Sequence, residues 1–232
     1  MTPAAAGMDG CFVDRRDAGR RLGAALGHLV HADPVVLALP RGGVPVGYEV
    51  ARALGSRLDV LLVRKVGAPS DPEFGIGAVA DGSEPQVLLD DALVRLVQPP
   101  PGYIDKAVAR EVTEIERLRE LYSAVRTPDS LAGRTVILVD DGIATGNTMR
   151  AALRAVVRQV PAWLVLAVPI APQNILSGLR AEVDEVVCLL TPEPFEAVSK
   201  HYADFAQTGN EEVFELLQLA CGEGARTVPP MD

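Results

Sequence analysis

Two adjacent carboxylates followed by a glycine-containing loop are the residues of this chain best suited to chemistry. Asp140 and Asp141 follow an apolar stretch, 136–139, and precede the loop 142–148, which is rich in Gly and Thr. The apolar stretch is typical of a buried strand, and residues 149–154 are typical of a helix. Carboxylates accept hydrogen bonds from hydroxyls, whereas N–H groups beside glycines at a helix start bind an anion. The segment therefore predicts a site for a sugar phosphate.

Other interpretations of this segment fit less well. Asp-Asp-Gly also ends strands as a simple turn with an N-cap, but two neighbouring carboxylates repel each other unless a ligand or metal occupies the site. A Walker loop needs four residues between its glycines and then a Lys, whereas Gly142 and Gly146 enclose three residues and Asn147 follows. The dinucleotide fingerprint has its glycines in another register and no carboxylate pair at the strand end.

Two upstream segments carry cations beside glycines. The apolar run 35–39 is followed by Pro40, then by Arg41-Gly42-Gly43 and a helical pattern over 44–51, whereas Arg64 and Lys65 end another apolar run before a loop rich in Gly and Pro. Arg and Lys bind several phosphate oxygens at once, so both segments could clamp a polyphosphate. The alternatives are an ordinary strand-to-helix turn at residue 41 and solvated charges at residues 64 and 65.

The segment 136–148 resembles the phosphoribosyl pyrophosphate (PRPP) motif of the type I phosphoribosyltransferases. The resemblance implies that Asp140 and Asp141 bind the ribose hydroxyls and that the loop from Gly142 wraps the 5-phosphate. Carboxylates there would also stabilise the oxocarbenium character that develops on the ribose. The implied phosphate ligands are the N–H groups of Ile143, Ala144, Thr145, Gly146 and Asn147 and the hydroxyls of Thr145 and Thr148.

The same resemblance implies roles for the upstream segments. Arg41, Gly42 and Gly43 correspond to the pyrophosphate loop, which in this family often contains a non-proline cis peptide. Arg64 and Lys65 would bind pyrophosphate and, with the two aspartates, make up the catalytic set. Mg²⁺ would be held mainly by the pyrophosphate and also by Asp140 and Asp141. The loop after Lys65 would close over the reaction centre, with Glu73 as a proton-handling or magnesium-shell residue.

The acceptor is less well defined by the sequence. The 6-oxopurine branch of the family has an Asp where this chain has Ala144, so a 6-oxopurine substrate is disfavoured. Phe195 corresponds to the aromatic residue that stacks on the base in the purine branches, with Tyr202 as the reserve. The alternative is that the aromatic residues of this segment anchor a surface lobe to the core.

Alternating strand and helix patterns predict an α/β fold with a doubly wound, mostly parallel sheet and a small accessory lobe, or hood. We expect one phosphoribosyltransferase-like domain over 1–232, with 1–8 disordered and 191–232 contributing to the acceptor site. The helices expected with the clearest patterns are 14–30, which His28 and His31 would close, and 103–125. Strands are expected at 35–39, 61–66, 136–139, 164–168 and 183–189.

Composition excludes several classes of partner. A formal net charge of −9 and only 4% aromatic residues argue against nucleic acid. No apolar run is long enough to span a membrane, and no leader is evident. Three widely spaced cysteines fit a reducing, cytoplasmic compartment, and neither they nor the three histidines have the spacing of a metal site. We also expect a homodimer.

These observations predict an enzyme of nucleotide metabolism that transfers 5-phosphoribosyl from PRPP to a nitrogenous acceptor and releases pyrophosphate. The alternative is a non-catalytic regulator that binds PRPP or a nucleotide on the same fold. A sugar-phosphate hydrolase is disfavoured, because the chain has no nucleophilic Asp-x-Asp or serine elbow.

Overall fold

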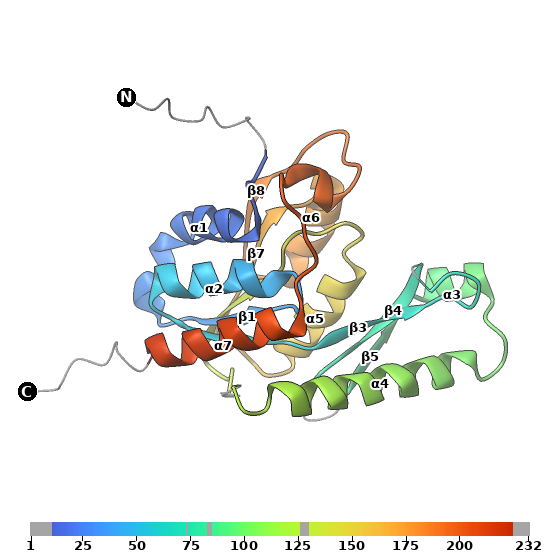
Figure 1. Cartoon of the computed structure of the whole chain (residues 1–232). Helices are drawn as coiled ribbons and strands as arrows, with labels where there is room; N and C mark the ends of the chain where they lie inside the picture. Colours follow the sequence, from blue (N-terminus) through green and yellow to red (C-terminus); the bar gives the residue numbers. More distant parts are fainter. Residues whose placement is uncertain (1–10, 73, 83–84, 126–129, 225–232) are drawn as a thin grey trace, which may run out of the picture.

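The computed structural model describes residues 11–72, 74–82, 85–125 and 130–224. A parallel sheet forms its centre (Figure 1). Its five strands run in the order β2-β1-β6-β7-β8. The predicted α/β fold is therefore confirmed. The expectations for residues 1–8, for Glu73 and for the last residues of the segment 191–232 lie outside the described residues. The central strands are β1 (Val35–Ala38), β2 (Arg57–Val60), β6 (Thr135–Val139), β7 (Trp163–Ile170) and β8 (Glu185–Leu190).

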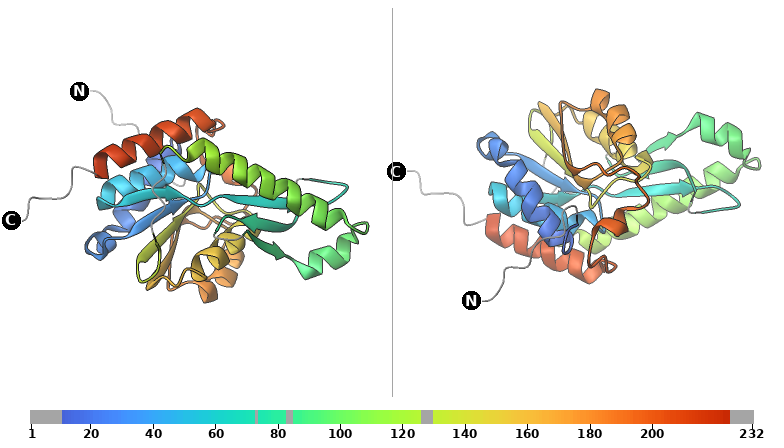
Figure 2. Two further views of the ribbon diagram at one scale, coloured as in Figure 1. Left: turned by 90° about the horizontal axis from the view of Figure 1, so that it is seen from below. Right: turned by 90° about the horizontal axis from the view of Figure 1, so that it is seen from above.

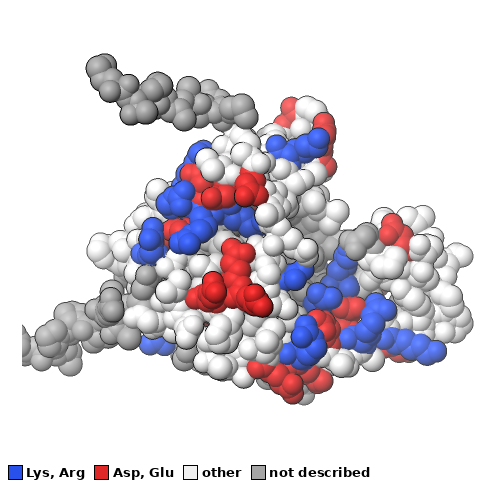
Figure 3. Space-filling model, in the orientation of Figure 1, with Lys and Arg blue, Asp and Glu red and all other residues white. Residues whose placement is uncertain are grey.

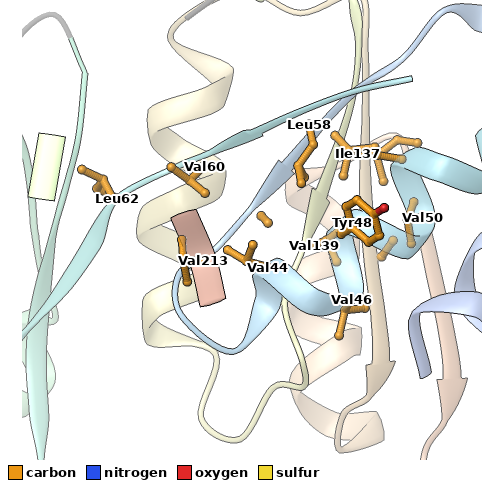
Figure 4. Packing of buried hydrophobic residues seen from close by; sticks show 14 of the residues in the cluster. Val44, Val46, Tyr48, Val50, Leu58, Val60, Leu62, Ile137, Val139 and Val213 are labelled. Atoms are coloured by element: carbon orange, nitrogen blue, oxygen red, sulfur yellow. The ribbon is translucent and has the colours of Figure 1, made fainter. Parts of the chain in front are cut away.

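Helices cover both faces of this sheet (Figures 1 and 2). On one face lie α1 (Arg15–Ala25), α2 (Gly43–Leu54) and α7 (Asn210–Gly224), and on the other α5 (Asn147–Val157) and α6 (Gln173–Leu179). Successive residues of a strand point to opposite faces. Ile137 and Val139 accordingly join the first helical layer, and Val136 and Leu138 the second. Figure 4 shows part of the first of these two cores, in which α2 packs against the strands.

The strand order places a switch point between β1 and β6. From β1 the chain crosses to β2 on one side, whereas β6, the next strand to enter the sheet, pairs with the other side of β1. In an open parallel sheet, ligands bind outside the carboxyl ends of the strands at such a point. The loops after β1 and β6 are those that carry Arg41 and the Asp140–Asp141 pair.

The accessory lobe is an antiparallel sheet in the middle of the chain. It consists of β3 (Val63–Gly67), β4 (Gly75–Ala80) and β5 (Gln86–Leu89), followed by α3 (Asp91–Val97) and α4 (Tyr103–Tyr122). This hood projects from the central sheet, and α4 runs along it (Figure 2). The helix expected at 103–125 is confirmed over Tyr103–Tyr122, and its apolar stripe packs into the core through Ile115 and Tyr122.

Three elements differ from the sequence expectation. The first helix ends at Ala25, and His28 and His31 lie in a separate 3₁₀-helix, η1 (Gly27–Ala32). The strand expected at 61–66 belongs to the hood, because the chain leaves the parallel sheet after β2 and pairs with β4. Helix α7 is absent from the sequence expectation, although apolar residues at helical spacing mark it. These are Val213, Leu216 and Leu217, which complete the core over α2. Two further 3₁₀-helices are η2 (Arg180–Glu182) and η3 (Val198–His201).

Candidate functional site

The loops after β1 and β6 touch each other at the carboxyl edge of the sheet. The N–H of Leu39 donates to the carbonyl of Val139 at 2.9 Å, which extends the pairing of the two strands into the loops. A Cβ on Gly42 would overlap the Asp141 carboxylate, and one on Gly43 would lie 3.0 Å from the Asp140 Cα. The two glycines therefore allow the Arg41 loop to lie directly against the aspartate pair. The Pro40–Arg41 peptide bond is cis, and Arg41 itself is exposed.

Each of the two carboxylates has one oxygen bound within the protein. Asp140 Oδ1 accepts from the backbone N–H of Asp141 at 2.9 Å, and Asp141 Oδ2 accepts from Arg15 Nε at 2.7 Å. Among the residues that the structure describes, no other residue donates to Asp140 Oδ2 or to Asp141 Oδ1. Two adjacent residues thus each keep one carboxylate oxygen that can accept a hydrogen bond from a ligand.

Burial raises the pKa of both carboxyl groups of this pair. Burial raises the pKa of Asp140 well above its ordinary value, and the neighbouring Asp141 charge raises it further. Burial also raises the pKa of Asp141, although Arg15 opposes that shift. A pair of carboxylates held in this way gains from a ligand that brings hydroxyl donors or a cation into the site.

The loop after Asp141 leads into the N-terminus of α5. Gly146 has a φ of 80°, a conformation that favours glycine, and it caps the helix without a side-chain bond. The N–H groups of Ala144, Thr145, Gly146 and Asn147 find no acceptor within the described part of the chain. The loop therefore presents four free donors at a helix start, which is the arrangement that binds phosphate.

Ile143 departs from the predicted set of phosphate donors. Its N–H donates to the carbonyl of Ile170 at 2.9 Å, and its side chain is buried. Burial of the apolar side chain turns this residue toward β7 and away from the open side of the loop. The prediction that Ile143 offers its N–H to the ligand is therefore wrong in this structure, whereas its neighbours keep theirs available.

Arg64 and Lys65 lie in the hood, inside β3 rather than at the end of a strand. Arg64 Nε donates to Glu111 Oε2 on α4 at 3.2 Å, and the Arg64 side chain is 44% exposed. The aliphatic stem of Lys65 lies against Gly75, and the side-chain amide of Asn147 reaches the Gly75 carbonyl at 3.4 Å. Lys65 and Asn147, at the start of α5, thus meet at the start of β4, whereas Arg64 faces α4.

The segment after β8 returns to the site from the other side. Tyr202 donates its hydroxyl to the Asp141 carbonyl at 2.6 Å, and its ring packs between Phe12 and Phe205. Because Tyr202 is only 6% exposed, it does not fit the role of a stacking residue for an acceptor. Phe195 is partly exposed and lies parallel to the His201 ring at 6.2 Å between centroids.

Arg15 is the residue of this site to which the sequence assigned no role. It comes directly after the N-cap of α1, Asp14, and its guanidinium contacts Asp141, the carbonyl of Ala206 at 2.6 Å and the face of Phe205 at 3.8 Å. Its position next to an N-cap resembles an ordinary exposed first-turn arginine, so only the tertiary contacts reveal it.

The donor set fits Mg²⁺ only in part. The free oxygens of Asp140 and Asp141 are the hard ligands that Mg²⁺ prefers. Within residues 11–72, 74–82, 85–125 and 130–224, however, no three His, Cys, Asp or Glu side chains gather around one point as a metal site. An ion held here would therefore take most of its ligands from substrate phosphates and water, as is usual for Mg²⁺.

The distribution of surface charge and the hydropathy of the helices bear on whether the protein binds nucleic acid or a membrane. On the face shown in Figure 3, basic and acidic side chains are interspersed, with no continuous basic band. None of the helices that the structure describes is long and apolar enough to cross a membrane.

A parallel sheet with this switch point, a carboxylate pair at a strand end and a glycine loop that leads into a helix is typical of a phosphoribosyltransferase-like protein. The family model of the phosphoribosyl transferase domain matches residues 22–190, and the chain belongs to this family. A relative from Mycobacterium tuberculosis (strain H37Rv), named "Putative phosphoribosyl transferase Rv0571c", is 43% identical over 209 residues, which are 90% of this chain and 47% of the relative. The chain thus spans about half the length of that curated relative.

A solved structure extends the similarity to the whole fold. The protein TT1426 from Thermus thermophilus is 44% identical, with a TM-score of 0.76 over 90% of this chain and 98% of that one. This similarity includes the hood as well as the central sheet, because it spans nearly all of both chains.

Proposed function

We propose that the chain transfers 5-phosphoribosyl from PRPP to a nitrogenous acceptor and releases pyrophosphate. The observation that carries the proposal is the pair Asp140 and Asp141 beside the start of α5. Among the described residues, each carboxylate has one oxygen without a partner, and four N–H groups at the helix start also have none. Ribose hydroxyls match the first feature and the 5-phosphate matches the second. Gly42 and Gly43 adjoin the carboxylates, so the Arg41 loop lies where the pyrophosphate would leave.

The chain's own residues account for most of the reaction. The phosphate loop anchors one end of the substrate, and the aspartates orient the ribose and stabilise positive charge that develops at its anomeric carbon. Mg²⁺, when bound with the pyrophosphate, would neutralise the leaving group. Arg41 and Lys65 would add positive charge on that side, and Phe195 is the proposed stacking residue for a planar acceptor.

The test is to follow pyrophosphate release with PRPP, Mg²⁺ and a panel of nitrogenous bases. The double substitution Asp140→Asn with Asp141→Asn removes two charge-assisted hydrogen bonds, so we expect kcat/KM to fall roughly 10²- to 10⁴-fold. Asp33→Asn is the matched control, because Asp33 is an exposed aspartate that pairs with Arg134. Unchanged kinetics in the double variant would overturn the proposal.

A non-catalytic regulator is the second candidate, and one contact favours it. Arg64 is engaged by Glu111 in the hood, so one of the two cations proposed for pyrophosphate faces another partner. In the same experiment, thermal stabilisation by PRPP and Mg²⁺ without pyrophosphate release would identify a regulator. Pyrophosphate release without any acceptor would indicate a hydrolase.

A further inference from the structure

Arg15 connects three parts of the chain that are far apart in sequence. It lies in the first turn of α1, donates from Nε to Asp141 at the end of β6 and donates from Nη1 to Ala206 after β8. Its guanidinium also stacks on Phe205. The Arg15 side chain is only 11% exposed and the Asp141 side chain 15%, so this ion pair is shielded from solvent. A shielded, charge-assisted pair holds its geometry far better than a surface pair.

The contacts of Arg15 fix the orientation of the Asp141 carboxylate. With Oδ2 bound to Arg15, the carboxylate cannot rotate without losing that bond, and Oδ1 stays available. Gly42 lies against Oδ2, so the same contact also sets the distance between the Asp141 carboxylate and the Arg41 loop. Tyr202 fixes the backbone of Asp141 through its hydroxyl. Side chain and backbone of one residue are thus held by two separate elements.

We propose that Arg15 is a positioning residue of the ribose site, which acts through Asp141 and joins it to the segment 195–206. This inference rests on the proposed function, because it assumes that Asp141 binds the ribose of PRPP. Arg15 keeps Asp141 oriented for a hydroxyl and attaches the ribose site to the segment that carries Phe195. A planar guanidinium is needed, because Nε and Nη1 bind two different acceptors while the plane stacks on an aromatic ring.

The experiment measures PRPP binding in the presence of Mg²⁺ by calorimetry for Arg15→Gln and Arg15→Lys. We expect the Kd to rise at least about tenfold for Arg15→Gln. Arg15→Lys keeps the charge but not both bonds, so we expect partial rescue. The matched control is Arg20→Gln, which removes a half-exposed arginine of the same helix that pairs with Asp17 and Glu49. It should bind like the wild type.

A double-mutant cycle with Asp141→Asn separates positioning from other roles. If Arg15 acts through Asp141, Arg15→Gln should change the Kd of the Asp141→Asn protein by less than about threefold, because the shared interaction is already lost. Additive effects would overturn the inference, as would a wild-type Kd in the folded fraction of Arg15→Gln with only a lower Tm. If Arg15→Gln does not fold, Arg15→Lys in the same cycle gives the answer. Failure of the wild-type protein to bind PRPP would instead overturn the proposed function.

Discussion

The proposed ribose and phosphate site differs from the hood in how its residues are held. At the sheet edge, Asp140 and Asp141 follow directly on β6, and Gly42 and Gly43 of the neighbouring loop pack against them. In the hood, Arg64 lies on an antiparallel strand and pairs with Glu111 on α4. The first group is fixed by strands buried on both faces, whereas the second lies on a projecting lobe. We therefore expect changes at the sheet edge to affect function more than changes in the hood.

The largest effect that distinguishes the two regions is expected from Gly42→Ala. The new Cβ would overlap the Asp141 carboxylate, which Arg15 holds in place, so either the Arg41 loop or the carboxylate must move. A misplacement of this kind in a reaction centre costs roughly 10²-fold, and we expect kcat/KM to fall by about that factor. Gly27→Ala is the control, because nothing lies within 4 Å of its added Cβ. Equal activity of the two variants would contradict the close packing of these loops.

A smaller effect is expected from Arg64→Gln in the hood. If Arg64 leaves Glu111 for the pyrophosphate when substrate binds, its removal should raise the KM for PRPP up to about tenfold. Arg110→Gln is the matched control, since Arg110 binds the other oxygen of Glu111 at 3.0 Å and is 66% exposed. Steady-state kinetics of both variants give the KM values for PRPP that are compared. An unchanged KM in Arg64→Gln would make this residue a structural partner of Glu111 and would widen the contrast between the two regions.

The smallest effect is on stability, and it concerns Asp140 in the unliganded protein. Because burial and Asp141 raise the pKa of Asp140 in the folded state, the folded state holds the proton more tightly than the unfolded state does. The contribution of this residue to stability is therefore greatest below the ordinary carboxyl pKa and is lost as the pH rises through the raised value. Asp140→Asn keeps the oxygen that accepts from Asp141 but carries no charge, so we expect a higher Tm than the wild type at neutral pH.

Thermal unfolding at several pH values tests whether the charge of Asp140, rather than the substitution in general, changes the Tm. The difference in Tm between Asp140→Asn and the wild type should shrink as the pH falls toward the ordinary carboxyl range. PRPP with Mg²⁺ should stabilise the wild type more than the variant. A variant that is less stable than the wild type at neutral pH would contradict the inferred cost of burying this carboxylate pair.

The site at the sheet edge was largely predictable, because the strand, the two aspartates and the glycine loop follow one another directly in the sequence. Apolar residues 136–139 must form a buried strand, so Asp140 and Asp141 necessarily emerge at its carboxyl end with the glycine loop behind them. The long helix at 103–122 was predictable for a similar reason, since its apolar residues recur at helical spacing. Helix α7 could have been found by the same signal in Val213, Leu216 and Leu217.

Contacts between distant segments could not be predicted in this way. Arg64 and Lys65 follow an apolar run that suggests a strand end, but pairing with β4 places them inside an antiparallel sheet. Ile143 belongs to the loop by sequence, yet its hydrogen bond to Ile170 removes its N–H from the site. Tyr202 was a candidate for stacking, but packing against Phe12 and Phe205 buries it.

By itself, the sequence determined the fold class and the two loops of the candidate site, and its resemblance to known motifs indicated the family. For the fold class and the loops, the order and polarity of neighbouring residues suffice, because strand burial and helix starts are local properties. The position of Arg15 on Asp141, across 126 residues of chain, was settled only by the tertiary structure. Such a contact depends on how α1, β6 and the segment after β8 pack together, and no spacing within one segment encodes it.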